Sequence, residues 1–166
     1  MKTMILKALA FAGVAAAGTL TSAPAFAQSA TGDATVTVLQ ALSVTKTADL
    51  NFGKITASNT ASTVAVAQDG TRTCGTGLTC YGTTTAGAFN VLGSAGESVS
   101  VVLDNPTITL ANGASDTMSV ALTASASSLT LTGGAGSFRV AGVLNVGAFQ
   151  AQGTYTGQYS VSVNYQ

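Results

Sequence analysis

Two cysteines, six acidic residues and four tyrosines are the side chains of this sequence that could carry site chemistry. Cys74 and Cys80 enclose five residues, and Gly75 and Gly77 among them let the backbone curl back. In an exported chain such a pair predicts a disulfide. The alternatives are a redox pair or a thiolate metal site, for which the sequence offers no further ligand.

The acidic residues show no pair at a spacing typical of acid–base catalysis and no Asp-rich calcium loop. The chain also lacks histidine, which excludes His-dependent catalytic sets and His-ligated metals. We therefore expect no enzymatic activity, no metal and no cofactor. The six residues concerned are Asp33, Asp49, Asp69, Glu97, Asp104 and Asp116.

Charge is sparse along the 166 residues, at 7% of the composition, where a soluble domain carries roughly 25%. Such a chain cannot neutralise a row of phosphates, so nucleic-acid binding is excluded as a function. There is no tryptophan to build an aromatic platform for sugars. We expect neither a nucleic-acid partner nor a small-molecule substrate.

The first 27 residues predict a removable export signal. Lys2 and Lys7 form its positive start, an apolar stretch runs over 8–20, and Ala25-Phe26-Ala27 is a small-x-small cleavage site. A membrane anchor is the alternative, but 13 apolar residues fall short of the roughly 20 that a bilayer core requires. Cleavage after Ala27 leaves one domain's length of chain, residues 28–166.

The mature chain alternates apolar and polar residues, with turn residues between the runs and no helical periodicity. Gly133 to Gly136 is interpreted as a turn, because no helix or Lys-Ser pair follows it as in a phosphate loop. About ten short strands predict an all-β, antiparallel, Ig-like β-sandwich. The expected strands are 34–39, 50–56, 62–67, 88–92, 98–103, 107–110, 117–123, 128–132, 138–146 and 155–165.

Sheet edges in this chain have little protection. Between Thr117 and Gln166 the only charged side chain is Arg139, whereas soluble monomers usually guard their edges with Lys, Pro or bulges. The sequence therefore indicates assembly through β-strand pairing.

Both ends of the mature chain carry an alternating pattern. At the N-terminus Ala34, Val36, Val38 and Leu42 fall on one face of an extended segment. At the C-terminus the strand is still alternating where the chain stops. The residues of its shared face are Tyr155, Gly157, Tyr159, Val161, Val163 and Tyr165.

These two ends resemble those of bacterial chaperone–usher fimbrial subunits, the pilins. The likeness rests on Gly153, fourteenth from the end, on the alternation after it, and on Tyr165, next to last. The segments 48–53 and 153–157 are also similar to a group of uncharacterised exported Ig-like bacterial proteins. The Cys74–Cys80 pair departs from pilins, many of which join more distant strands.

The resemblance implies a domain that lacks its last strand and is completed by a donor strand from another subunit. A periplasmic chaperone would first pair with the C-terminal strand, from Gly153 to the carboxylate of Gln166, and an outer-membrane usher would assist assembly. The next subunit's Val36, Val38 and Leu42, with Ala34 where space is tight, would then replace it. The implied product is a homopolymeric surface fimbria with a role in adhesion or biofilm.

The expected organisation is a signal over 1–27, a donor extension over 28–42 and an Ig-like domain over 43–166. An alternative function is a self-complemented secreted or cell-surface sandwich that binds a protein or glycan. In that case residues 34–42 are the first strand of their own domain, and the tyrosines are ordinary core and rim side chains.

Overall fold

The computed structural model describes residues 26–166. The expected signal residues Lys2, Lys7, 8–20 and Ala25 lie outside this range. Residues 37–166 form one compact unit. No helix in the described part of the chain is long and apolar enough to cross a membrane.

Residues 26–166 contain twelve strands and no helix. They are β1 Ser43–Ala48, β2 Lys54–Thr56, β3 Ser62–Val66, β4 Arg72–Cys74, β5 Thr79–Tyr81, β6 Gly87–Leu92, β7 Ser98–Leu103, β8 Thr107–Ala111, β9 Thr117–Ala124, β10 Ser128–Thr130, β11 Ala135–Val146 and β12 Val161–Tyr165. Every pairing between them is antiparallel.

The strands form a large sheet of seven strands, a small sheet in the order β10-β7-β12, and a separate β2-β5 pair. β11 is the axis of the large sheet: it pairs with β6 and then β3 along one edge, and with β9 along the other. The inner faces of the large and small sheets share one hydrophobic core. This arrangement confirms the predicted all-β, Ig-like sandwich.

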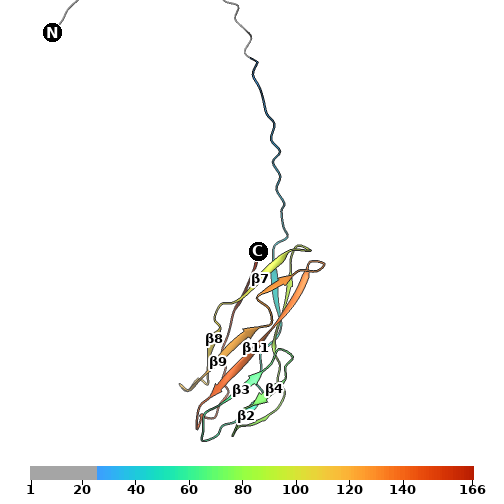
Figure 1. The fold of residues 1–166 in the computed structure, drawn as a ribbon. Helices are drawn as coiled ribbons and strands as arrows, with labels where there is room; N and C mark the ends of the chain where they lie inside the picture. Colours follow the sequence, from blue (N-terminus) through green and yellow to red (C-terminus); the bar gives the residue numbers. More distant parts are fainter. Residues whose placement is uncertain (1–25) are drawn as a thin grey trace, which may run out of the picture. The chain divides into compact units, whose positions relative to one another are not determined.

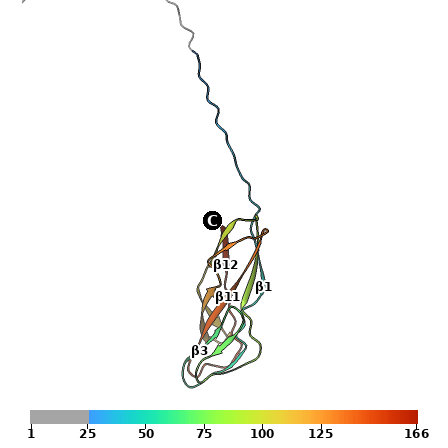
Figure 2. The ribbon, with the colours of Figure 1, turned by 45° about the vertical axis from the view of Figure 1, so that its right-hand side comes forward.

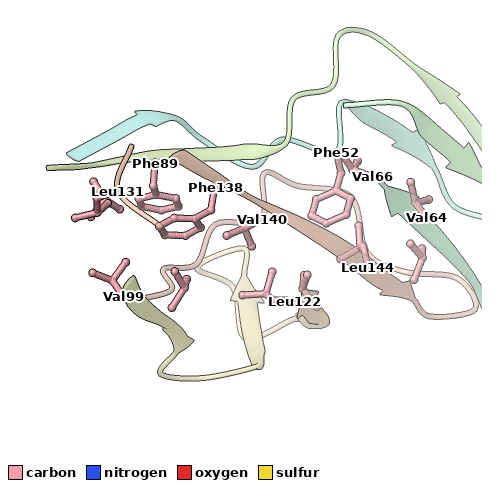
Figure 3. Close-up of a cluster of buried hydrophobic side chains, with 14 residues drawn as sticks. Phe52, Val64, Val66, Phe89, Val99, Leu122, Leu131, Phe138, Val140 and Leu144 are labelled. Carbon is pink, nitrogen blue, oxygen red and sulfur yellow. The ribbon is translucent and has the colours of Figure 1, made fainter. Parts of the chain in front are cut away.

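The alternation along β11 explains how the core forms. Val140 and Leu144 are buried, whereas Val143 points to the outer face. Phe138 stacks on Phe89 of β6 with ring centroids 5.2 Å apart, and Figure 3 shows this pair beside Val140. Because successive side chains of a strand point to opposite faces, one long strand supplies core residues over its whole length.

β11 also defines two ends of the compact unit. We use the name near pole for the end of the compact unit where the chain enters. It contains Gln40, Ser94, Gly134 and Tyr165. These residues lie together because Gly93 N–H donates to Gly134 O at 2.9 Å and the Tyr165 hydroxyl donates to Gln40 O. The loops 57–61, 112–116 and 147–153 form the far pole. Figures 1 and 2 show the C-terminus at the same end of the domain as the entry of the chain, with β2, β3 and β4 toward the opposite end.

Three predicted strands differ from the structure. Residues 34–39 form no strand in the single chain, because no neighbouring strand pairs with them. The 50–56 strand is reduced to Lys54–Thr56, preceded by a single bridge from Asn51 to Thr85. The 155–165 strand begins only at Val161, because the segment before it leaves the small sheet and bridges β8 through Thr156 and Ala111.

Three observed strands lie outside the predicted ranges. β1 has a sequence without apolar alternation, and its side chains from Ser43 to Thr47 are exposed. β4 and β5 have three residues each and flank the disulfide loop. The predicted turn is present at Gly133 and Gly134, both with positive φ, while Ala135 and Gly136 already belong to β11.

The predicted disulfide between Cys74 and Cys80 is present, with the two Cα atoms 6.1 Å apart. It connects β4, at an edge of the large sheet, to β5 of the separate pair. A bridge that closes so short a loop stabilises by roughly 2 kcal/mol on the chain-entropy account. Its structural effect is to attach the β2-β5 pair to the large sheet.

A pair of substitutions in β11 tests the assignment of faces. Leu144→Ala removes a buried side chain and should lower the free energy of unfolding by about 2–5 kcal/mol. Val143→Ala, on the outer face of the same strand, should change it by no more than about 0.5 kcal/mol. Urea unfolding of the mature chain measures both, and equal losses would contradict the faces described.

Candidate strand-acceptor site

The C-terminal strand β12 has one unpaired edge. It is the last strand of the small sheet and pairs only with β7. Ser160 O accepts from Asp104 N, and Gln166 N donates to Ser98 O, so the even-numbered residues of β12 direct their backbone groups to β7. The N–H and C=O groups of Val161, Val163 and Tyr165 therefore point away from β7, to the open edge.

The same three residues direct their side chains into the core. Val161, Val163 and Tyr165 are half-buried and pack against it. The intervening Ser162 lies on the outer side, where its hydroxyl donates to Asp104 Oδ1 at 2.6 Å. β12 is thus held by its side chains and by one neighbour, while its other edge still offers donors and acceptors.

A cleft of about 930 Å³ lies between the 49–57 segment and the 150–159 segment. Its lining includes apolar side chains of β8, β9 and β11, namely Ile108, Leu110, Met118, Val120, Leu144 and Val146. Gln150 to Gly157 and Tyr159 line it from the C-terminal side. The cleft therefore lies toward the far pole, and the C-terminal chain leaves it to become β12.

Arg72 fixes the 49–57 side of the cleft. One guanidinium nitrogen donates to the carbonyl oxygens of Tyr81 at 3.0 Å, Phe52 at 3.3 Å and Gly82 at 3.4 Å. Gly53 has φ +77°, and a Cβ there would collide with the same guanidinium. A cation shared by three carbonyls holds this irregular backbone in place without a strand partner.

Tyr155 fixes the opposite side. Its hydroxyl donates to Ala151 O at 2.8 Å and accepts from Gln150 Nε2 at 2.8 Å. Asn112 Nδ2 lies 3.4 Å from the same hydroxyl and 3.0 Å from Asp116 Oδ2. The cleft thus has both of its sides fastened by polar contacts, although neither side is a regular strand.

Tyr159 stands where the cleft meets β12. Its ring packs edge-on against Phe89 with centroids 6.0 Å apart. Its hydroxyl is buried and has no hydrogen-bond partner within residues 26–166. Burial, with a smaller effect of the Asp49 carboxylate, raises the pKa of this phenol. An unsatisfied buried hydroxyl is costly.

A clasp at the near pole fixes the root of the N-terminal extension. The Tyr165 hydroxyl donates to Gln40 O at 2.6 Å and accepts from Ser94 N at 2.7 Å. Gln40 N donates in turn to Ser94 Oγ at 2.7 Å. A Cβ on Gly93 would lie 2.6 Å from the Tyr165 hydroxyl, so the clasp requires glycine there.

The predicted donor residues fall into two groups. Ala34, Val36 and Val38 lie exposed outside any strand, and the two valines are each 87% exposed. Leu42 instead packs on its own core beyond the clasp. The extended segment that precedes the clasp therefore ends at Leu39.

The predicted C-terminal residues are also divided. Gly153 and Tyr155 line the cleft, Tyr159 stands at its end, and Val161, Val163 and Tyr165 belong to β12. Gln166 adds a last backbone bond to Ser98, and its side chain accepts from Ser128 Oγ at 3.1 Å. The strand expected over 155–165 is thus confined to Val161–Tyr165.

Sequence reasoning missed Ser94, Arg72 and Gly93, which position the site. Their contacts join residues 9 to 71 positions apart, and no local pattern signals them. Gly53, the last residue of the segment 48–53, has a positive φ of +77°. No cluster of three metal-ligating side chains occurs in the described part of the chain.

Comparison with known proteins identifies one family. The family described as "Domain of unknown function (DUF4402)" matches residues 42–165. No curated protein and no solved structure matches significantly. The matched region coincides with the domain beyond the clasp and leaves residues 28–41 outside it.

Removal of one hydroxyl tests the clasp. Tyr165→Phe deletes both hydrogen bonds and leaves Ser94 N–H unpaired, so unfolding free energy should fall by about 1–3 kcal/mol. Amide exchange at Gln40 should accelerate at the same time. Tyr81→Phe, at an exposed tyrosine, is the matched control and should change neither quantity. Equal behaviour of the two variants would argue against the clasp.

Proposed function

This chain belongs to the DUF4402 family, and we propose that it is the structural subunit of a surface fimbria. Successive subunits assemble by donor-strand complementation: the extension of one copy adds to the open edge of β12 in another. The observation that carries the proposal is that edge, where Val161, Val163 and Tyr165 present unpaired backbone groups while their side chains complete the core.

The N-terminal extension supports the proposal from the donor side. Val36 and Val38 expose almost their whole side chains and share one face of an extended segment. Isolated exposed valines are common, but two on one face of an unpaired extended segment suit a strand that joins a sheet on binding. The backbone of this segment supplies the donors and acceptors that the β12 edge lacks.

Two terms favour binding of the extension to the β12 edge. Burial of two valines contributes roughly 1.5–3 kcal/mol each. Each added ladder hydrogen bond contributes roughly 0.5–1.5 kcal/mol net. Ordering of the segment opposes these terms, so slow release depends on the ladder and the valines together.

Assembly of this kind requires helpers before the donor arrives. On the proposed function the chain is exported through the periplasm, where a chaperone covers the β12 edge and binds near Gln166. An outer-membrane usher then directs exchange for the next subunit's extension. The finished fibre lies on the cell surface, where it serves adhesion or biofilm formation.

The cleft favours one second candidate. Its size and mixed lining fit a self-complete secreted or cell-surface sandwich that binds a protein or glycan there. In that case the extension is a tether and takes no part in assembly. The two functions differ in what the valines of the extension do.

Substitutions on the two faces of the extension distinguish these functions. In the full chain expressed in its native host, Val36→Asp with Val38→Asp should abolish the denaturant-resistant ladder of unheated samples. Charges buried against the apolar side chains that line part of the cleft are costly. Thr35→Asp with Thr37→Asp adds the same charge on the opposite face and should retain the ladder.

A full ladder in both double variants would contradict donor-strand assembly. Absence of any ladder from the unsubstituted chain would favour the self-complete domain. Urea unfolding of the two double variants, each measured as the unassembled monomer, serves as the fold control, and the two curves should match.

A further inference from the structure

Among residues 40–166, Phe149 is the most exposed large apolar side chain, at 79%. It lies at the far pole, immediately after the end of β11. Its backbone has φ +50°, a left-handed conformation that a bulky residue adopts only under strain. The strain is maintained by the surroundings: Phe149 N–H donates to Ser58 O at 2.8 Å, and Gln150 Oε1 accepts from Gly147 N.

The direction in which the donated segment runs along β12 determines which part of the incoming copy lies near Phe149. This step rests on the proposed function. The even-numbered face of the extension reads Ala30, Gly32, Ala34, Val36, Val38, so its large side chains lie next to its own domain. The wide cleft of the acceptor lies toward the far pole. The valines fill it when the incoming segment runs antiparallel to β12.

In that polarity the incoming domain sits close to the acceptor's far pole. Only Leu39 separates Val38 from Gln40, which the clasp binds to its own domain. Two residues of extended chain span roughly 7 Å. Gln150 lines the same cleft, and Phe149 is its neighbour in the chain. The near pole of the incoming copy therefore comes within reach of the Phe149 ring.

The near pole carries apolar side chains that suit this ring. Leu92 is 50% exposed and Leu39 is 37% exposed. Leu92 precedes the buried Gly93 of the clasp, and Leu39 precedes Gln40. No charged residue stands among residues 39–44 or 92–96 to oppose an apolar contact.

We infer that Phe149 forms a second, end-to-end contact between successive copies of this chain, packing on Leu39 and Leu92 of the incoming copy. The donor strand joins two subunits through the short link from Val38 to Gln40, and this contact restrains the rotation of one domain on the next. A rigid aromatic side chain suits such a role, because it loses little conformational entropy on binding.

Glycine substitution separates the contact from the fold. Phe149→Gly relieves the left-handed backbone, so the monomeric V36D/V38D chain that carries it should unfold at the same or a higher urea concentration. In assembling chains it should accelerate dissociation of the ladder roughly tenfold. Ser115→Gly is the matched control: Ser115 is also left-handed, at φ +81°, in a far-pole loop, and its loss should leave the ladder unchanged.

A thiol pair tests the contact directly. All cysteines of the described chain are already joined in the disulfide, so Leu39→Cys and Phe149→Cys introduce the only free thiols there. Mild oxidation of a mixed assembly should yield a covalent dimer that survives heating, and neither variant alone should yield it.

Two results would overturn the inference. If V36D/V38D abolishes the ladder but Phe149→Gly leaves its dissociation unchanged and no mixed dimer forms, successive copies do not meet at Phe149, and the proposed function stands. If V36D/V38D leaves the ladder intact, the proposed function fails and this contact fails with it.

Discussion

The structure depends on the double role of three alternate residues, Val161, Val163 and Tyr165. Their side chains close the core between the two sheets, while their backbone groups point to an edge without a neighbour. A strand in this position cannot be released without opening the core, and β7 pairs with only one of its two edges. Edge strands in soluble proteins are usually charged or covered, and the last fifty residues offer only Arg139 for that purpose.

The remaining architecture keeps this edge accessible. β11 runs along the large sheet from the near pole to the far pole. The clasp lies at the near pole, and the cleft lies toward the far pole. Arg72 and the disulfide hold the 49–57 side of the cleft, and Tyr155 holds the other. Two irregular segments kept apart by such contacts leave a cleft of about 930 Å³ between them.

The sequence predicts the sandwich well, because alternation along strands such as β3, β7 and β9 directly encodes which side chains enter the core. The disulfide follows from the short Cys74–Cys80 spacing. β1 could not be predicted, since its partner β6 stabilises it through backbone pairing while its side chains stay exposed. The clasp also could not be predicted from the sequence. Alternation identifies Tyr165 only as a core aromatic, because its hydrogen bonds to Gln40 and Ser94 join chain segments far apart in sequence. Leu42 continues the apolar face of the extension, and only the position of the clasp separates it from that segment.

The even-numbered side chains of the extension are small from Ala30 to Ala34 and larger at Val36 and Val38. This difference in size bears on whether the extension would pair with β12 of its own domain or with β12 of another copy. β12 runs toward the near pole, and the extension is rooted there at Gln40. If the extension folded back on its own domain it would run parallel to β12, placing Ala30 and Gly32 at the wide cleft. Its two valines would then meet the near pole, where Leu42, Leu131 and Tyr165 already crowd Gly93. An incoming extension from another copy, antiparallel to β12, places Val36 and Val38 at the cleft and the smaller residues beside Val161 and Val163. Large side chains fill large spaces only in the second case, so packing favours exchange between copies over insertion within one.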